Sequence, residues 1–398
     1  MARRINEIKK PDLISLQKKV EAVAGFTIKN PVDCEQLSDS IFKKTKFYIS
    51  SATLKRFMGF YDSGFKSSYQ TLDILSIYCG HDGWNNFINP TNRDINITDE
   101  EITFLKNIFN LKDYNQILDH DETMQMVSRR IAERLREAPE SIEKIVPFLA
   151  KNKLSQVFYF EHFPDYDYLV SYQYKGYIEY LKHKKTTEAQ IFGNCILFFR
   201  AFLIMDKELM KVYHQNLINI EITEDIHPMP LGRYYKCLIL FEHFVMQKSI
   251  SKILQHIYSI EKRLPRIGLH FKNFPGFHYF VADSLILCGY YKDTLKLIEL
   301  ATKNYTIHRE FVWKGYYRQF QLMMAEANYR LNRKWKSLAL IEKINPSNFY
   351  FISQTYFTVR YNLLFIEMTD GKSKANKIKE TKSLIVKHQF LVLSNFYQ

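Results

Sequence analysis

The sequence predicts an all-α protein in which a small N-terminal domain precedes a long array of helix pairs. Its 398 residues include 27 Tyr and 31 Phe but only 13 Gly and 11 Pro, which favours long packed helices over sheets. From residue 98 onward no stretch alternates with period two for long. Thr98 with Glu101 three residues later forms a capping box, which marks a helix start. We therefore expect an N-terminal domain at 1–88, a linker at 89–97 and helix pairs at 98–398.

Length, charge and cysteine usage narrow the class of protein. The chain exceeds one ordinary core, and its net charge of +14 calls for a polyanionic partner or a strongly solvated surface. The five cysteines are scattered and never spaced as Cys-x-x-Cys, so we expect buried thiols in a reducing compartment. The N-terminus lacks an apolar signal-peptide core, and the most apolar stretch, 191–205, is too short to span a bilayer. These features predict a cytoplasmic protein without membrane contact.

The first expected helix covers residues 12–24, with Asp12 as its N-cap. Its apolar face would carry Leu13, Leu16, Val20 and Val23. In front of it stand four basic residues, Arg3, Arg4, Lys9 and Lys10. Together with Lys18 and Lys19 on the outer face of this helix, they would form a basic arm that contacts DNA phosphates, and a solvated tail is the alternative.

Residues 34–60 predict two short helices and a tight connection. The first helix would bury a stripe of Leu37, Ile41 and Phe42. Ser50 would cap the second helix, which Gly59 ends. The second helix has the inner face Leu54, Phe57 and Met58 and the outer face Ser51, Ala52, Lys55 and Arg56. A DNA-reading helix-turn-helix needs this arrangement.

A helix over residues 69–79 should complete the domain, capped by Ser67 or Ser68 and closed by Gly80. Its inner side would be Leu72, Leu75 and Ile77. Trp84 follows in a last turn and would fill the small core, with a base-stacking platform as the alternative.

Three stretches carry a resemblance to a known family: Gln36-Leu37-Ser38, Ile49-Ser50-x-x-Thr53-Leu54-x-Arg56 and Thr71-Leu72-Asp73-Ile74-Leu75. They resemble the Xre/Cro repressor class of helix-turn-helix domains, in which a Gln at the start of the first helix contacts the DNA backbone. The residues after the Ile-Ser cap of that class face the major groove. The resemblance implies contacts to double-stranded DNA from Gln36, Ser50, Ser51, Ala52, Lys55 and Arg56. A helical packing module without a ligand is the alternative.

The rest of the chain predicts consecutive helices with polar or proline-containing breaks. They cover 99–110, 121–137, 140–150, 165–183, 187–205, 207–219, 231–246, 249–263, 275–289, 291–303, 311–332, 334–344, 348–368 and 374–387. The string Leu295-Lys296-Leu297-Ile298-Glu299 recurs as Leu338-Ala339-Leu340-Ile341-Glu342, each time after a long helix and a tight turn. This pattern resembles a tetratricopeptide-like repeat and implies an α-solenoid. An irregular helical bundle is the alternative.

Catalytic and metal-binding patterns are weak. Glu161, His162, Asp165 and Asp167 gather near a turn and could bind a metal, but capping of the following helix by Asp165 explains them better. The sequence contains no phosphate loop, Gly-x-Ser-x-Gly or glycine-rich fingerprint. We expect no enzymatic activity, no cofactor and no metal site.

Tyrosines and asparagines suggest a groove between helix pairs. Tyrosines between Tyr159 and Tyr180 fall on more than one side of a helix, so some would line a groove, although core packing explains most. Asn328 and Asn362 each stand beside a tyrosine in successive long helices, and such amides can clamp an extended peptide. The expected groove residues are Tyr172, Asn328, Tyr329, Tyr361 and Asn362.

A Cro-like domain in front of tetratricopeptide-like repeats resembles the peptide-sensing transcription regulators of bacteria. The resemblance implies sequence-specific DNA binding, a homodimer formed through the repeats, and a peptide or protein ligand that changes the separation of two DNA-reading heads. A non-catalytic helical-repeat scaffold whose helix-turn-helix does not read DNA is the alternative function.

Overall fold

The computed structural model describes residues 10–45, 47–61, 67–81, 83–88, 97–110, 122–138, 141–264, 275–304 and 311–395. Within these ranges every regular element is helical and none is a strand, which confirms the predicted all-α class. No helix in the same ranges is long and apolar enough to cross a membrane. The chain divides into two compact units, which we call the N-terminal unit (residues 1–95) and the C-terminal unit (residues 96–398).

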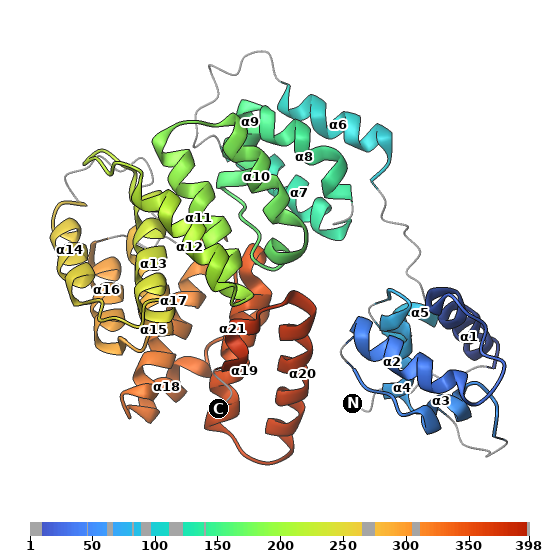
Figure 1. Ribbon diagram of the computed structural model, residues 1–398. Coiled ribbons are helices and arrows are strands. Elements are labelled where there is room, and N and C mark those ends of the chain that lie inside the picture. The colour runs from blue at the N-terminus through green and yellow to red at the C-terminus, as the bar shows by residue number, and fades with distance from the viewer. Residues whose placement is uncertain are drawn as a thin grey trace. The chain divides into compact units, whose positions relative to one another are not determined.

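The N-terminal unit, blue in Figure 1, contains α1 (Lys10–Ala24), α2 (Asp33–Thr45), α3 (Ser51–Phe57), α4 (Tyr69–Tyr78) and α5 (Trp84–Ile88). Its core is formed by Leu16, Val20, Leu37, Ile41, Leu54, Leu72, Leu75 and Trp84, all fully buried. The indole of Trp84 stacks on the ring of Phe87 at a centroid distance of 5.7 Å. The buried indole confirms that Trp84 fills the core and is not a platform for bases.

Serine caps fix where α3 and α4 begin. Ser50 Oγ accepts a hydrogen bond from the Thr53 backbone N–H at 3.2 Å, and Ser68 Oγ accepts one from the Thr71 backbone N–H at 3.2 Å. Each cap satisfies an N–H that has no partner within its helix. The predicted starts of both helices are confirmed.

Two side chains depart from the predicted inner faces. Phe42 is 48% exposed, because it follows Ile41 directly and is rotated from it by about 100° around the helix axis. Thr45, one turn beyond Ile41, takes the inner position and donates to the Ile41 carbonyl at 2.7 Å. In α4, Ile77 is only partly buried, and Ile74 is buried instead.

The C-terminal unit begins with α6 (Asp99–Phe109), and its predicted cap is present: Thr98 Oγ1 accepts a hydrogen bond from the Glu101 N–H at 3.1 Å. The longer helices after it are α7 (Glu122–Glu137), α8 (Ile142–Lys151), α10 (Tyr174–His183), α11 (Thr187–Leu203), α12 (Lys207–Ile218), α13 (Pro228–Phe244), α14 (Ser251–Glu261), α15 (Gly276–Leu287), α16 (Tyr291–Asn304), α17 (Phe311–Arg330), α18 (Lys334–Ile341), α19 (Gln354–Met368) and α20 (Lys372–His388). The short elements are α9 (Lys153–Ser155), the π-helices η3 (Gln156–Glu161) and η4 (Leu169–Gln173), the 3-10 helices η6 (Pro346–Asn348) and η7 (Phe351–Ser353), and α21 (Leu391–Ser394).

The helices of this unit pack in a regular order. We call α11, α13, α15, α17 and α19 the A helices, each of which packs against the next. We call α12, α14, α16, α18 and α20 the B helices, each of which follows its A helix along the chain. Gly232 in α13 permits a close approach of α13 to α15, because a Cβ at this position would lie 2.6 Å from the Phe277 Cα in α15.

Segments far apart in the sequence close the C-terminal unit. The backbone N–H of Tyr166 donates to the carbonyl of Ile352 at 2.7 Å, and α21 packs on α11. This closure explains two corrections to the predicted helices. The helix expected from residue 165 begins only at Leu169, and the helix expected from residue 348 begins only at Gln354, as α19. In both cases the residues before the helix make long-range hydrogen bonds instead of helical ones.

Candidate functional site

The α2–α3 pair presents only part of the predicted DNA-facing set to solvent. Gln36, Ala52 and Arg56 are exposed, and Ser51 is half-buried. Ser50 is also half-buried, and its hydroxyl is occupied by the cap on Thr53. Its role in the structure is therefore to start α3.

Lys55 corrects the predicted outer face of α3. Its Nζ lies 3.4 Å from Glu35 Oε1 of α2, and its side chain is only 19% exposed. Since ion pairs at the surface contribute little, a DNA phosphate could compete for this ammonium. The predicted DNA-facing set did not include Lys43, Lys44 and Tyr48, which lie around the turn between α2 and α3 and are exposed. The run of basic residues in this part of the sequence was the signal that could have pointed to them.

The predicted phosphate-contact arm falls largely outside the described residues. Arg3, Arg4 and Lys9 lie there entirely, and Lys10 begins α1 with its side chain outside the description. The arm therefore stays a prediction.

The predicted amides of the peptide groove are placed differently. Asn328 is 5% exposed and donates to the Met324 carbonyl of its own helix at 2.8 Å. Asn362 is fully buried and lies 3.3 Å from Glu380 Oε1 of α20. Both amides are thus enclosed by packed helices and face no open groove in this structure, in contrast to the prediction.

The tyrosines predicted beside them are less enclosed. Tyr329 is half-buried and donates through its hydroxyl to the Glu367 carbonyl at 3.1 Å. Tyr361 and Tyr172 are half-buried, with rings near Phe365 and Tyr168 respectively. These three side chains therefore take part in three different contacts.

A buried network of charges crosses the A helices, and sequence reasoning missed it. Lys236 of α13 donates to Asp283 Oδ2 of α15 at 2.6 Å. Arg360 of α19 donates to the other oxygen of Asp283, and its Nε donates to Glu326 Oε1 of α17 at 3.1 Å. Lys236, Asp283 and Arg360 are at most 3% exposed. One carboxylate therefore connects cations from two other helices.

The network lies in an aromatic environment. Lys236 Nζ is 3.8 Å from the ring centroid of Phe199, and the guanidinium of Arg233 is 3.9 Å from that of Phe280. Arg233 also donates to the Tyr166 hydroxyl at 3.1 Å. Cation–π contacts of this kind partly replace the lost hydration of buried cations. They also place Tyr166 in the core, as the core-packing interpretation of the tyrosines expects.

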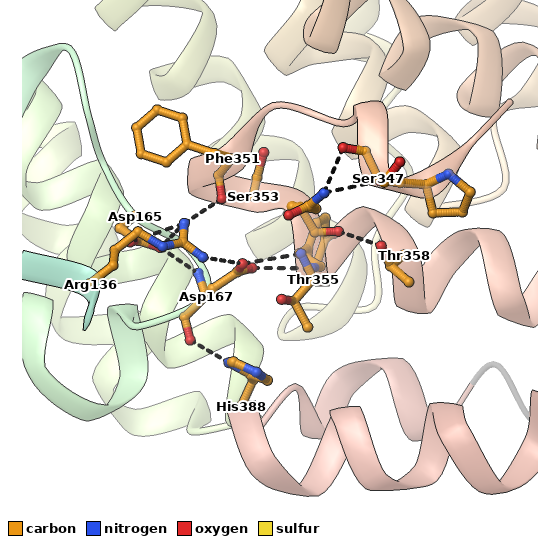
Figure 2. Close-up of polar contacts among 12 residues, drawn as sticks. Arg136, Asp165, Asp167, Ser347, Phe351, Ser353, Thr355, Thr358 and His388 are labelled. Atoms are coloured by element: carbon orange, nitrogen blue, oxygen red, sulfur yellow. Dashed lines mark hydrogen bonds and ion pairs between the residues drawn. The ribbon is translucent and has the colours of Figure 1, made fainter. Parts of the chain in front are cut away.

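The residues that close the C-terminal unit form a second polar cluster, which we call the clasp: Arg136, Asp165, Asp167, His388 and the backbone of residues 351–356 (Figure 2). The Arg136 guanidinium contacts Asp165 Oδ2 at 3.2 Å and Asp167 Oδ2 at 3.0 Å. It also donates to the Phe351 carbonyl, and His388 Nδ1 donates to the Asp167 carbonyl at 2.7 Å.

Asp167 caps α19 from a distant part of the chain. Its carboxylate accepts hydrogen bonds from the backbone N–H groups of Thr355 at 3.1 Å and Tyr356 at 3.2 Å. A negative charge is favoured at a helix N-terminus. The acidic cluster near residue 165 therefore does cap a helix, as predicted. The capping residue is Asp167 and the capped helix is α19, whereas the prediction was that Asp165 caps the helix that follows it in the chain. No group of three or more potential metal ligands occurs in the part of the chain that the structure describes.

We expect Asp167→Ala to destabilise the C-terminal unit by about 2–3 kcal/mol, since it removes a cap and one of the two carboxylates that face the partly buried guanidinium of Arg136. Asp167→Asn keeps an acceptor for α19 and should cost less. Denaturant unfolding followed by circular dichroism measures both. Asp225→Ala, at an exposed aspartate that bonds only within its loop, is the matched control and should leave the midpoint unchanged. Equal midpoints for Asp167→Ala and wild type would show that the clasp does not hold the unit closed.

Comparison of the chain with protein-family models, with curated proteins and with solved structures found no match.

Proposed function

We propose that the protein is a sequence-specific DNA-binding transcription regulator in which the α2–α3 pair acts as a helix-turn-helix. One observation carries the proposal: Leu54 and Phe57 seat α3 on the core, while Arg56 stays exposed on the opposite side. No packing contact requires an arginine there. Arginine is also the side chain that most often reads guanine in the major groove.

The C-terminal unit would supply regulation. A helices that pack in series, each followed by a B helix, agree with a tetratricopeptide-like α-solenoid. We propose that this array dimerises and responds to a peptide or protein partner, so that the distance between two DNA-reading heads changes. Because Asn328 and Asn362 are enclosed, such a partner would contact other residues of the array.

A non-catalytic interaction scaffold is the second candidate, and the contact between Lys55 and Glu35 favours it. In a scaffold the α2–α3 pair would only pack against the rest of its unit, and an ion pair that joins Lys55 of α3 to Glu35 of α2 would support that packing. The two candidates differ in whether the N-terminal unit binds DNA at all.

The proposed function is tested with fragment 1–88 and the full chain on duplexes that carry one or two half-sites, obtained by selection from random sequences. A dimeric regulator predicts weak binding of the fragment to one half-site. It also predicts that the full chain binds two half-sites on the order of 100-fold more tightly, through effective concentration. Gel shifts measure both affinities. Equal affinities for fragment and full chain would contradict dimeric reading, and no binding by either would favour the scaffold.

A further inference from the structure

The outer face of α18 leaves apolar side chains uncovered. The opposite side of this helix is held by its unit: Ser337 Oγ donates to the Ala325 carbonyl of α17 at 2.8 Å, and Ile341 is 5% exposed. Trp335 and Leu338, by contrast, are 71% and 49% exposed. They stand at positions i and i+3, so their side chains are neighbours on one face of the helix. Figure 1 shows α18, in orange, at the edge of the C-terminal unit.

The exposed tryptophan gives this face most of its apolar area. A single apolar side chain on a surface is common, but a tryptophan ring is large and gains much free energy when a partner removes it from water. The Trp335 ring has a neighbour within its own helix, since Lys336 Nζ lies 5.2 Å from its centroid. Ala339 is also exposed, and its small side chain allows a partner to approach closely. The face therefore offers apolar area for a contact.

Basic residues surround this apolar pair. Residues 333–343 contain four cations and one carboxylate, all exposed: Arg333, Lys334, Lys336, Lys343 and Glu342. None of the five makes an ion pair with another residue that the structure describes. Three of the cations stand at the N-terminal end of α18, where a positive charge is unfavourable for a helix. The stability of α18 therefore does not explain them.

The acids at the end of α19 do not neutralise these cations. Ser337 Oγ of α18 lies 3.7 Å from Sδ of Met368, the last residue of α19. Near this contact, Glu367 pairs with Arg330 at 2.5 Å, and Asp370 lies 3.9 Å from Lys374. Each of these two carboxylates thus faces a cation outside the 333–343 segment. The positive charge of the segment stays in excess, and a partner with negative charge complements it.

We propose that the outer face of α18 is a docking site for an acidic amphipathic segment of another protein. Apolar side chains of that segment would cover Trp335 and Leu338, and its carboxylates would contact the surrounding cations. A nucleic acid fits less well, because a phosphate backbone would meet the cations but leave the aliphatic Leu338 in water. The inference rests on the proposed function, in which the array responds to a peptide or protein partner, and it names the chemistry of that partner.

The probe for the test is a fluorescein-labelled synthetic helix with leucines along one side and glutamates on the others. Its fluorescence anisotropy with the full chain measures affinity. Replacing the glutamates of the peptide with glutamines should weaken binding about tenfold, and added salt should weaken binding of the glutamate peptide alone. Acrylamide quenching locates the contact: the glutamate peptide should protect the fluorescence of Trp335, which is identified as the signal lost in Trp335→Phe. Polyglutamate, which lacks apolar side chains, should leave Trp335 open to the quencher.

Variants of the apolar part test whether the peptide covers Trp335. Trp335→Ala should weaken binding of the glutamate peptide about thirtyfold or more, since a buried tryptophan contributes much of the binding energy of an interface. Met126→Ala, at a methionine of α7 that is also 71% exposed, is the matched control and should leave the affinity unchanged. Both positions are exposed, so the thermal transition should stay the same in both variants.

Variants of the charged part test the role of the cations. The double variant Lys334→Gln, Lys336→Gln should weaken binding of the glutamate peptide about three- to tenfold, because exposed ion pairs are individually weak. The double variant Lys379→Gln, Lys382→Gln changes two exposed lysines of α20 and controls for the general positive charge of the chain. It should bind the peptide like the wild type.

Three results would overturn the proposal: equal affinities for the glutamate and glutamine peptides, equal affinities of Trp335→Ala and Met126→Ala, or equal effects of the two double lysine variants. Protection of Trp335 by a DNA duplex of random sequence to the same extent as by the peptide would also overturn it, in favour of a nucleic-acid surface. The readout lies at Trp335, whereas DNA reading by α3 is measured with Arg56→Ala. Failure of this docking site and failure of the proposed function are therefore distinguishable.

Discussion

Replacing Asp283 with alanine is expected to lower the free energy of unfolding of the C-terminal unit by about 3–5 kcal/mol. The carboxylate binds Lys236 and Arg360 at once, and all three side chains are buried. Without it, Lys236 loses its only ion-pair partner among the described residues while it stays in an apolar environment. A buried charge left without a partner is among the largest single costs in a folded protein.

The double variant Lys236→Met, Asp283→Leu separates the cost of an unpaired charge from the value of the pair. Apolar replacements of similar size often match or exceed a buried ion pair, so the double variant should recover most of the lost stability. Urea unfolding of the wild type, Asp283→Ala and the double variant measures these differences in the free energy of unfolding. A loss below about 1 kcal/mol in Asp283→Ala would show that the charges are hydrated and that the network is not buried as described.

Acidification should weaken the same network in a predictable direction. Burial by itself would raise the pKa of Asp283, but Lys236 and Arg360 hold it below its ordinary value. A carboxyl with a lowered pKa stabilises the fold above its unfolded pKa of about 3.9 and loses this contribution as pH falls through the folded value. The wild type should therefore lose stability more steeply below about pH 4 than Asp283→Asn.

Arg56→Ala is expected to weaken specific DNA binding by about 1–3 kcal/mol, or roughly fivefold to more than a hundredfold. The side chain is exposed and supports no core contact, so the thermal transition should stay unchanged. Lys55→Ala should have a smaller effect on binding, since this ammonium must first leave Glu35. Lys29→Ala, at an exposed lysine between α1 and α2, is the matched control. Equal affinities for Arg56→Ala and Lys29→Ala would exclude base reading by Arg56.

Local signals in the sequence predicted most helix starts. Ser50, Ser68 and Thr98 each cap a helix through a backbone N–H three residues away, and such a contact depends only on neighbouring residues. Helix period likewise predicted the buried sides of α2 and α3. Phe42 was misplaced because it stands at the edge of its helix stripe, where the packing of neighbouring helices decides burial.

Long-range partners could not be predicted in the same way. Asp167 caps α19 and Asp283 joins α13 to α19, and both contacts depend on how successive helices are rotated and closed. The prediction placed Asn328 and Asn362 in a groove because their spacing along the sequence does not show which side of each helix faces a neighbouring helix. A usable signal existed for the charge network: Lys236, Asp283 and Arg360 each interrupt an apolar run, and an isolated charge in a buried helix implies a partner.

The most direct test of DNA reading by α3 is selection of binding duplexes from a random pool by the full chain and by Arg56→Ala, followed by sequencing. The proposal predicts that the wild type enriches a defined motif and that Arg56→Ala loses preference at one position of it while keeping the rest. Enrichment of no motif by the wild type, or an identical motif and affinity for the variant, would contradict it.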